Sequence, residues 1–335
     1  MGCGSLGGVM AGRLAGQPDL DLTVFDRDKR ISEAINSAGL ILRQGKRSWT
    51  FRVRLLQEAA GGPFDALILA TKAGSLLGAA ATLQSHLSPE ACVITVQNGL
   101  AALDLPGVVG LDRLVPGCVL WGASMDAPGV YKITNSGSFI IGALAEAKSA
   151  SSVSRAKELL SRIFPVRVSG NIRGVLWSKL AITTNFTTLG AITGLPFGKQ
   201  AADREIREIM IRICGELYRI GRAEGVSFEP LSPALNIERF LSDRGYPRFV
   251  KHLLLRILGY KIRDDESSML DSLRRGQKTE IDFINGRLVQ SADQRGVAVP
   301  YNRLAVDLIR RMEAGELEPA RDNLAAFYDP ARMVE

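Results

Sequence analysis

The chain begins with a glycine-rich turn. Residues Gly2 to Gly7 follow the pattern GxGxxG and lead into a helical stretch that we expect to end near Leu14. Glycines are needed in such a turn because the backbone bends tightly, approaches a pyrophosphate closely and lets the next helix pack on a sheet. The pattern is weak by itself, but Asp26 ends the next predicted strand nineteen positions after Gly7, where a partner for ribose hydroxyls is expected. The turn therefore predicts a dinucleotide-binding, Rossmann-type sheet.

One feature of that fold is missing from the sequence. Only Met1 precedes Gly2, whereas the glycine turn should follow a β-strand. This first strand is central in a doubly wound sheet, so its loss would leave backbone groups of two neighbouring strands without hydrogen-bond partners. We therefore expect a misassigned or truncated start, with several more apolar residues upstream in the natural chain. An in-frame stop codon directly before the Met1 codon would contradict this.

Two domains are expected, because 335 residues exceed what one hydrophobic core usually organises. Short β-branched runs alternate with helical stretches up to about residue 142, as in a parallel sheet wrapped by helices. The expected strands are residues 20–25, 66–71, 92–97 and 114–120, followed by a hairpin of residues 130–134 and 138–142 joined by Asn135, Ser136 and Gly137. Later apolar residues recur at three- and four-residue spacing, clearest over residues 206–223. We place a dinucleotide-binding domain at residues 1–168 and an all-helical domain at residues 169–335.

Composition argues against several other classes of protein. Charged residues make up 23% of the chain, and no apolar run is long enough to span a membrane. No secretory signal precedes the first strand, and the four cysteines lack metal-site or disulfide spacing, so we expect reduced thiols in a cytoplasm and no metal. The net charge of +7 is spread along the chain, which favours a small anionic ligand over nucleic acid. Ordinary surface or packing roles are expected for His86 and His252.

Further segments occur in an order that can be compared with known families. They are Thr71-Lys72-Ala73, Gln97-Asn98-Gly99, Trp177-Ser178-Lys179-Leu180, Ser267-Ser268-Met269-Leu270, Thr279-Glu280-Ile281-Asp282, Asn285-Gly286, and the closing run of residues 296–300 with Asn302. Together they resemble the ketopantoate reductase family over nearly the whole chain. The resemblance implies NADPH-dependent reduction of a small 2-oxo acid, 2-dehydropantoate to pantoate in pantothenate biosynthesis, by a Rossmann domain followed by a helical one.

The resemblance also assigns roles to residues. Lys179 would donate the proton to the carbonyl, and Glu280 would hydrogen-bond where cofactor and substrate meet. The expected cofactor contacts, with Asp26 and Arg27 added from the strand end itself, are Gly2, Cys3, Gly4, Ser5, Leu6, Gly7, Asp26, Arg27, Lys72, Asn98, Ala123 and Glu280. The expected substrate contacts are Asn98, Lys179, Thr183, Thr187 and Ser268.

A role for a lysine in ketone reduction also follows from the chemistry, independently of the family resemblance. Hydride delivery to a ketone builds negative charge on oxygen, and a cation placed there stabilises that charge and supplies the proton. Taken singly, each residue has an ordinary reading: Lys72 and Lys179 as solvated lysines, and the Ser268 and Thr279 segments as helix starts with capping-box spacing. Asn98 and Gly99 could form a simple turn. The joint occurrence in order favours the functional reading.

Three positions depart from the family. Thr183 and Thr187 stand where asparagines usually share the face of Lys179, and Phe197 replaces a third asparagine. Threonine offers fewer hydrogen bonds than an amide, so the pocket should be more apolar and the 2-oxo acid itself stays open.

Cofactor choice and activity also leave alternatives open. Asp26 favours NADH, whereas Arg27 and family habit favour NADPH. A dehydrogenase for another 2-keto or 2-hydroxy acid and a non-catalytic nicotinamide-binding regulator remain alternatives. The apolar helices are compatible with a homodimer.

Overall fold

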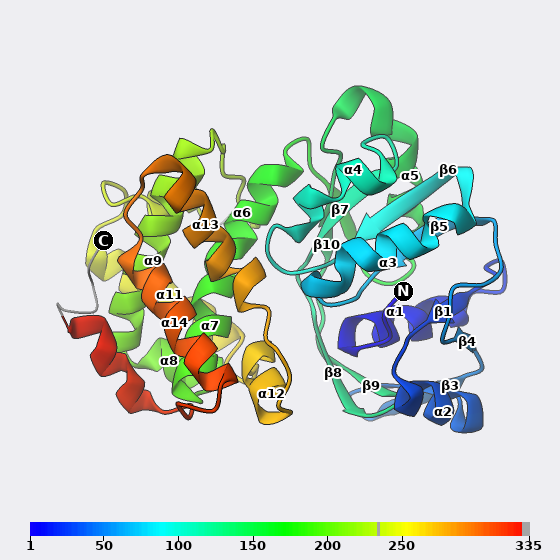
Figure 1. The fold of residues 1–335 in the computed structure, drawn as a ribbon, viewed down its shortest axis with the longest axis horizontal. Helices are drawn as coiled ribbons and strands as arrows, with labels where there is room; N and C mark the ends of the chain where they lie inside the picture. Colours follow the sequence, from blue (N-terminus) through cyan, green and yellow to red (C-terminus); the bar gives the residue numbers. More distant parts are fainter. Residues whose placement is uncertain (233–234, 330–335) are drawn as a thin grey trace. The chain divides into compact units, whose positions relative to one another are not determined.

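The computed structural model describes residues 1–232 and 235–329, and the chain divides into two compact units (Figure 1). The sheet unit comprises Met1–Gln97 and Ala101–Ile172, and the helical unit comprises Asn98–Leu100 and the chain from Arg173 onward. The predicted boundary between residues 168 and 169 therefore lies close to the one after Ile172. The turn at Asn98–Leu100 groups with the helical unit, although the prediction placed it in the first domain.

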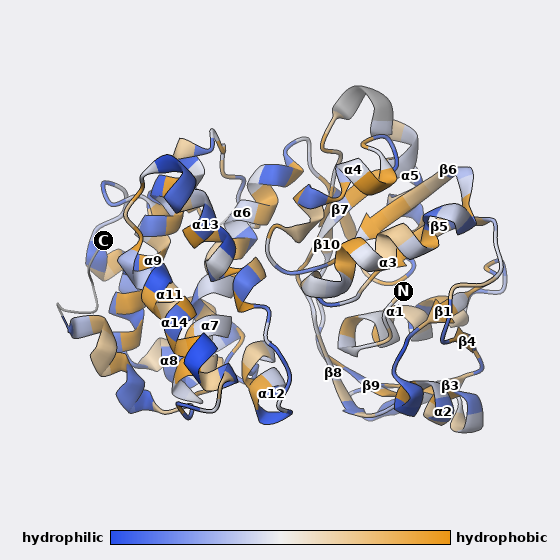
Figure 2. Cartoon of the chain, viewed as in Figure 1, coloured by the Kyte–Doolittle hydropathy of each residue, from blue (hydrophilic) through white to orange (hydrophobic). Residues whose placement is uncertain are grey.

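The sheet unit contains three separate groups of strands. The strands are β1 (Thr23–Phe25), β2 (Leu40–Gln44), β3 (Arg47–Phe51), β4 (Arg54–Leu56), β5 (Phe64–Leu69), β6 (Leu87–Thr95), β7 (Leu114–Val119), β8 (Gly122–Ala127), β9 (Val130–Asn135), β10 (Phe139–Ile141) and β11 (Val166–Val168). One sheet has the order β11-β10-β7-β6-β5, a second has the order β3-β2-β9-β8, and β1 pairs in parallel with β4. Strands β5, β6 and β7 run parallel and are predominantly apolar, as Figure 2 shows.

Helices pack on these strands, because the apolar face of each helix is buried against the apolar side chains of the strands. They are α1 (Ser5–Ala15), α2 (Lys29–Ala38), α3 (Leu76–Leu83), α4 (Pro106–Val109) and α5 (Glu146–Ser161). Helix α5 packs on β6 and β7, whereas α1 packs on β2, β8 and β9. The predicted helix ending near Leu14 and strands at the four predicted places are observed, with ends that differ by up to five residues. The prediction of one parallel sheet holds for β5, β6 and β7, whereas β1 pairs with β4 outside that sheet.

Strands β1 and β5 are not paired with each other in the residues that the structure describes. Only two residues bridge them: the Met1 amine donates to Ile68 O at 2.8 Å, Ala70 N donates to Met1 O at 2.8 Å, and Gly2 N donates to Phe25 O at 2.8 Å. A groove of about 530 Å³ lies along the rest of these two strand edges, lined by apolar side chains that include Met10, Leu22 and Ile68. Apart from these contacts, no described strand pairs with the facing edges of β1 and β5.

The predicted hairpin of residues 130–134 and 138–142 is wrong. Strand β9 pairs with β2 and β8, whereas β10 pairs with β7 and β11, so the two strands belong to different sheets. The hairpin that does form joins β8 to β9 through Pro128 and Gly129, where Gly129 has φ +77°. The turn-forming residues Asn135 to Gly137 carry the chain from one sheet to the next, which local turn chemistry cannot distinguish from a hairpin.

The helical unit consists of packed helices without sheet in its described part. They are α6 (Ile172–Ile182), α7 (Thr188–Thr193), α8 (Phe197–Ala202), α9 (Arg204–Ala223), α10 (Ile237–Leu241), α11 (Arg248–Lys261), α12 (Ser268–Arg274), α13 (Asn285–Arg295) and α14 (Pro300–Glu313). A π-helical segment, Thr183–Thr187, joins α6 to α7. The amphipathic helix predicted over residues 206–223 is confirmed as α9, which packs on α13 and α14. None of the helices that can be described combines the length and apolar character needed to cross a bilayer.

Candidate active site

The glycine turn owes its shape to close backbone contacts at its two ends. Gly2 has φ +89°, and a Cβ there would come within 2.7 Å of Thr71 N. A Cβ on Gly7 would overlap the carbonyl oxygen of Gly2. The middle glycine differs, because no atom lies within 4 Å of the position that a Cβ on Gly4 would take. Nothing within the protein therefore requires glycine at position 4, whereas a ligand lying against the turn would.

Asp26 closes the glycine turn. Its Oδ2 accepts a hydrogen bond from Cys3 N at 2.5 Å, and its Oδ1 accepts one from Asp28 N at 2.8 Å. The carboxylate thus ties the turn to the end of β1, a structural role that the sequence reasoning missed. Its expected contact with ribose hydroxyls stays a prediction, as does the role of the exposed Arg27 beside it.

A buried tyrosine packs against the glycine turn and bonds to its backbone. Tyr131 is fully buried, and its hydroxyl donates to Cys3 O at 2.6 Å and lies 3.2 Å from Cys3 Sγ. Its ring occupies the space that a Cβ on Gly8 would need. Burial raises the pKa of the Cys3 thiol to about 11, so the thiol stays protonated and unreactive. No local pattern predicts this support, since β9 lies more than a hundred residues after the turn.

Polar atoms gather where β5 and β6 end. Gln97 Nε2 donates to Leu69 O at 2.8 Å and to Thr71 O at 2.9 Å, joining the two strand ends. Its own Oε1, and Thr71 Oγ1, are buried without a hydrogen-bond partner among the residues that the structure describes. Buried polar atoms are normally paired, so these two are suited to receive a ligand. Lys72 follows directly and is exposed, and Ala123 lies half-buried on β8.

These features together fit a dinucleotide. The first turn of α1 carries no acidic residue, and its N-cap Gly4 makes no side-chain cap. A helix N-terminus of this kind favours a phosphate, because its backbone N–H groups and dipole attract negative charge. The open space at Gly4 and the unpaired atoms at the strand ends lie in the same sheet unit. Residues of three predicted segments, Gly2–Gly7, Asp26 and Thr71–Lys72, would therefore hold the cofactor.

In the helical unit, Lys179 lies in the last turn of α6 between two fully buried neighbours, Ser178 and Leu180. It is itself half-buried. Thr183 and Thr187 are buried as well, and Thr183 Oγ1 donates to Lys179 O at 3.2 Å. The prediction that both threonines share the face of Lys179 assumed the α-helical period. Because Thr183–Thr187 form a π-helix with wider turns, that period does not extend past Thr183, and their substrate contacts stay a prediction.

Ser268 begins α12, but the neighbouring serine caps the helix. Ser267 Oγ accepts from Leu270 N at 3.1 Å and donates to Thr187 O at 2.5 Å. The capping-box reading of Ser268 is therefore wrong by one residue, and Ser268 itself is exposed at the start of the helix. The cap also ties the start of α12 to the π-helical segment that follows Lys179.

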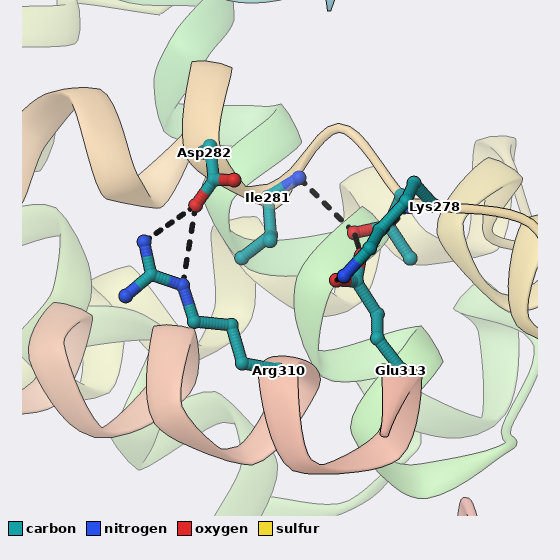
Figure 3. A network of polar contacts seen from close by, with 6 residues as sticks. Lys278, Ile281, Asp282, Arg310 and Glu313 are labelled. Carbon is teal, nitrogen blue, oxygen red and sulfur yellow. Dashed lines mark hydrogen bonds and ion pairs between the residues drawn. The ribbon is translucent and has the colours of Figure 1, made fainter. Parts of the chain in front are cut away.

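The segment that carries Glu280 is held by α14, as Figure 3 shows. Glu313 Oε1 accepts from both Thr279 N and Thr279 Oγ1 at 2.7 Å, while Lys278 Nζ lies 3.0 Å from Oε2. Burial disfavours the charge of this carboxylate, but these hydrogen bonds outweigh it and lower the pKa of Glu313. On the other side of Glu280, Arg310 pairs with Asp282 at 2.6 Å. The backbone just before Glu280 is thus bonded to α14, and an exposed side-chain ion pair joins Asp282 to the same helix.

One of the three departures from the family, Phe197, lies against another aromatic residue. Phe197 packs against Phe186 with ring centroids 5.3 Å apart, and Phe186 is fully buried within the π-helical segment. An aromatic pair therefore stands where the resemblance led us to look for an amide. Among the described residues, no group of three or more His, Cys, Asp or Glu could hold a metal ion.

A Rossmann-like sheet unit with a phosphate-type glycine turn, followed by a helical unit carrying a half-buried lysine, defines a class of nucleotide-dependent oxidoreductases. Two family models match the chain: "Ketopantoate reductase PanE/ApbA" over residues 1–146 and "Ketopantoate reductase PanE/ApbA C terminal" over residues 171–313. The chain belongs to the ketopantoate reductase family and is an oxidoreductase, as the sequence resemblance predicted.

Individual relatives agree with this assignment. The 2-dehydropantoate 2-reductase of Pyrococcus abyssi is 27% identical over 322 residues, which cover 94% of this chain and 97% of that protein. A crystal structure of a PanE/ApbA family ketopantoate reductase from Ralstonia eutropha JMP134 is 25% identical, with a TM-score of 0.78 and coverage of 94% of this chain and 98% of that one. A D-mandelate dehydrogenase solved with NADH and anilino(oxo)acetate shares the fold, at 20% identity and a TM-score of 0.82 over 94% of this chain and 97% of that one.

Proposed function

We propose that this protein reduces a small 2-oxo acid with NADPH, that 2-dehydropantoate is its substrate, and that Lys179 donates the proton. The single observation that carries the proposal is that Lys179, Ser268 and Glu280 belong to one helical unit, in which the segments beside them are held by hydrogen bonds. Ser267 donates to the π-helical segment that follows Lys179, and Thr279, just before Glu280, bonds to Glu313 of α14. Curated relatives named 2-dehydropantoate 2-reductase support the choice of substrate.

The reaction needs one hydride and one proton. Reduced nicotinamide supplies the hydride to the keto carbon when the cofactor is bound. The Lys179 ammonium hydrogen-bonds to the carbonyl oxygen, stabilises the negative charge that builds there, and transfers a proton to complete the hydroxyl. Lys179 then regains a proton from water. The carboxylate of Glu280 orients the ammonium, and Ser268 donates a hydrogen bond to the substrate carboxylate.

The sheet unit binds and orients the cofactor. Residues Gly2–Gly7 would hold the pyrophosphate, and the absence of a side chain at Gly4 would let it approach the backbone. Arg27 pairs with the 2′-phosphate and sets the preference for NADPH, while Asp26 holds the turn closed through Cys3 N. Lys72 and Ala123 would contact the cofactor beyond the pyrophosphate, and the resemblance assigns Asn98, which groups with the helical unit, to the cofactor as well.

A second candidate is a dehydrogenase for another 2-keto or 2-hydroxy acid. The Phe186–Phe197 pair and the loss of two amides at Thr183 and Thr187 favour a substrate with a more apolar side chain. The related fold solved with anilino(oxo)acetate belongs to an enzyme named for an aromatic hydroxy acid.

An assay of NADPH consumption with ketopantoate, 2-oxoisovalerate and phenylglyoxylate tests the proposal, with NADH run in parallel. We expect the highest kcat/KM for ketopantoate with NADPH. Preference for one of the other acids would support the second candidate, and a strong preference for NADH would contradict the role given to Arg27. Dinucleotide binding without oxidation of any substrate would show a non-catalytic regulator instead.

We also propose a homodimer that acts in the cytoplasm. Helix α11 exposes large apolar side chains at one helical face, with Phe249 73% and Tyr260 68% exposed and Leu253 and Ile257 between them. Such a patch is typical of a protein interface. The four cysteines are free thiols, as a reducing compartment favours. Light scattering of the purified protein tests the dimer.

A further inference from the structure

The π-helical segment Thr183–Thr187 begins one residue after α6 ends and four residues after Lys179. A π-turn is rare because its hydrogen bonds connect residues five apart and add one residue to an α-helical turn. If the segment became α-helical, the extra residue would join the regular helix. Helices α6 and α7 would then rotate relative to each other by about 100°, the angle of one α-helical residue. Some contact must therefore hold the π-turn in place beside Lys179.

Asn285 makes that contact. It is fully buried as the first residue of α13, about a hundred positions further along the chain. Its Nδ2 donates to Thr184 O at 3.2 Å, and its Oδ1 accepts from Thr188 Oγ1 at 2.6 Å. One amide thus bonds to the π-helical segment near its start and to the residue directly after its end. Asn285 belongs to a motif that the resemblance singled out, yet the proposed function gives it no role.

A directional chain of hydrogen bonds fixes the orientation of this amide. Asn285 Nδ2 also donates to Asn302 Oδ1 at 3.0 Å, and Asn302 Nδ2 donates to Glu216 Oε2 at 2.7 Å. Glu216 is buried in α9 and accepts further hydrogen bonds from Tyr301 N and Asn302 N, both at 2.9 Å. An ionised carboxylate can only accept hydrogen bonds, so Glu216 must face the NH₂ group of Asn302. The oxygen of Asn302 then faces the NH₂ group of Asn285, which orients that amide.

We propose that Asn285 is a positioning residue for Lys179. By locking the π-turn between Thr184 and Thr188, and with Glu216 setting its orientation through Asn302, it fixes the direction in which the last turn of α6 presents the lysine. The proposal rests on the proposed function, in which Lys179 protonates the substrate. It explains why a buried carboxylate and two buried amides are kept in a helical core that apolar side chains could fill.

The test is a double-mutant cycle on the full chain. Asn285→Asp keeps the size of the side chain but places a carboxylate against Thr184 O and Asn302 Oδ1, so the lock is lost. Since misplacing a catalytic group by about 1 Å costs roughly a hundredfold, we expect kcat to fall about 10- to 100-fold. KM and the dissociation constant for NADPH should change less than about twofold, because Asn285 acts on the chemical step alone. In a Lys179→Ala background the same substitution should have no further effect on kcat, since it acts through the lysine.

Two further variants keep the test independent of folding. Ser291→Ala, also on α13, removes a buried hydroxyl that bonds to Glu224 away from the π-turn, and should leave kcat unchanged. Thr188→Val removes one hydrogen bond to Asn285 with little change of shape, and should lower kcat with the native fold retained. Equal kcat in wild type, Asn285→Asp and Thr188→Val, with Lys179→Ala inactive, would overturn the positioning role alone. Full turnover in Lys179→Ala would instead overturn the proposed function.

Discussion

Gly99 lies against the backbone of Phe283 so closely that a Cβ at residue 99 would come within 2.5 Å of the Phe283 carbonyl oxygen. Gly99 has φ +81°, so glycine is needed for both its conformation and its packing. Phe283 follows Glu280 by three residues, in the short helix Ile281–Phe283. The turn that carries Asn98 is therefore placed beside the segment that carries Glu280, and the two predicted site segments belong to the same unit.

The glycines of the first turn have different roles, and substitution can separate them. Gly8→Ala forces a methyl group into the ring of Tyr131 and should lower the free energy of unfolding by about 1–3 kcal/mol. Gly4→Ala meets open space, so it should leave stability nearly unchanged while weakening NADPH binding at least about tenfold, since the methyl group stands where the pyrophosphate lies. Denaturant unfolding and fluorescence titration with NADPH measure the two quantities. Unchanged affinity in Gly4→Ala would contradict the placement of the cofactor.

Glu313 should act on stability through Thr279. Glu313→Gln turns an acceptor of two hydrogen bonds into a neutral amide and should cost about 1–3 kcal/mol of unfolding free energy at pH 7. The pKa of the native carboxyl is lowered, so its contribution is present above the pKa of the unfolded state and is lost as the pH falls through the folded pKa. The stability difference between wild type and Glu313→Gln should therefore shrink below about pH 4.5. If the difference in unfolding free energy between the two proteins stayed constant from pH 7 to pH 3, the charge of Glu313 would not contribute to stability.

In a chain that starts at Met1, stability should also depend on the Met1 amine near neutral pH. Burial lowers the pKa of this amine from 8.0 to about 6, so between these values the unfolded chain binds the extra proton. The free energy of unfolding should then rise from pH 6 to pH 8, by about 3 kcal/mol for two units, and be flat with respect to this group below pH 6. Acetylation of a chain that retains Met1 removes the charge and should abolish this rise. Identical pH dependence of both forms would contradict the burial of the amine.

The groove between β1 and β5 should accept a strand. An extension of six apolar, β-branched residues placed ahead of Met1 would supply the missing backbone partners and cover the groove lined by Met10, Leu22 and Ile68. Because each buried side chain contributes about 1.5–3 kcal/mol, we expect the unfolding free energy to rise by at least about 3 kcal/mol. An extension of six serines and aspartates is the matched control and should give no gain. Equal stability of the two extended chains would count against a strand-shaped site.

The sequence was most informative where structure is local. The glycine turn, α1, β1 and the parallel strands β5 to β7 follow from short-range patterns. Strands β2 and β3 were not predicted, since both are short, β3 carries polar residues such as Arg47 and Ser48, and β2 pairs with the distant strand β9. The false hairpin after Val130 has the same origin, because strand pairing is decided by the whole sheet.

The site shows the same division. Order and spacing of motifs predicted Lys179, Ser268 and Glu280 as site residues, but the contacts that hold their segments come from residues distant in sequence. The π-turn after Lys179 is bonded to Asn285, about a hundred residues further along the chain. The spacing of apolar residues around this turn predicts a continuous α-helix instead. Gln97, Tyr131 and Glu313 support the site through backbone contacts that no motif reveals.

Turnover of the Lys179→Ala variant tests the central claim most directly. With ketopantoate and NADPH in excess, we expect kcat to fall at least about a hundredfold, as general acid catalysis contributes about 10²- to 10⁴-fold. The dissociation constant for NADPH should stay within about twofold of wild type, because Lys179 is assigned to the substrate and not to the cofactor. A kcat equal to that of wild type would contradict the account, since no proton donor would then be needed at position 179.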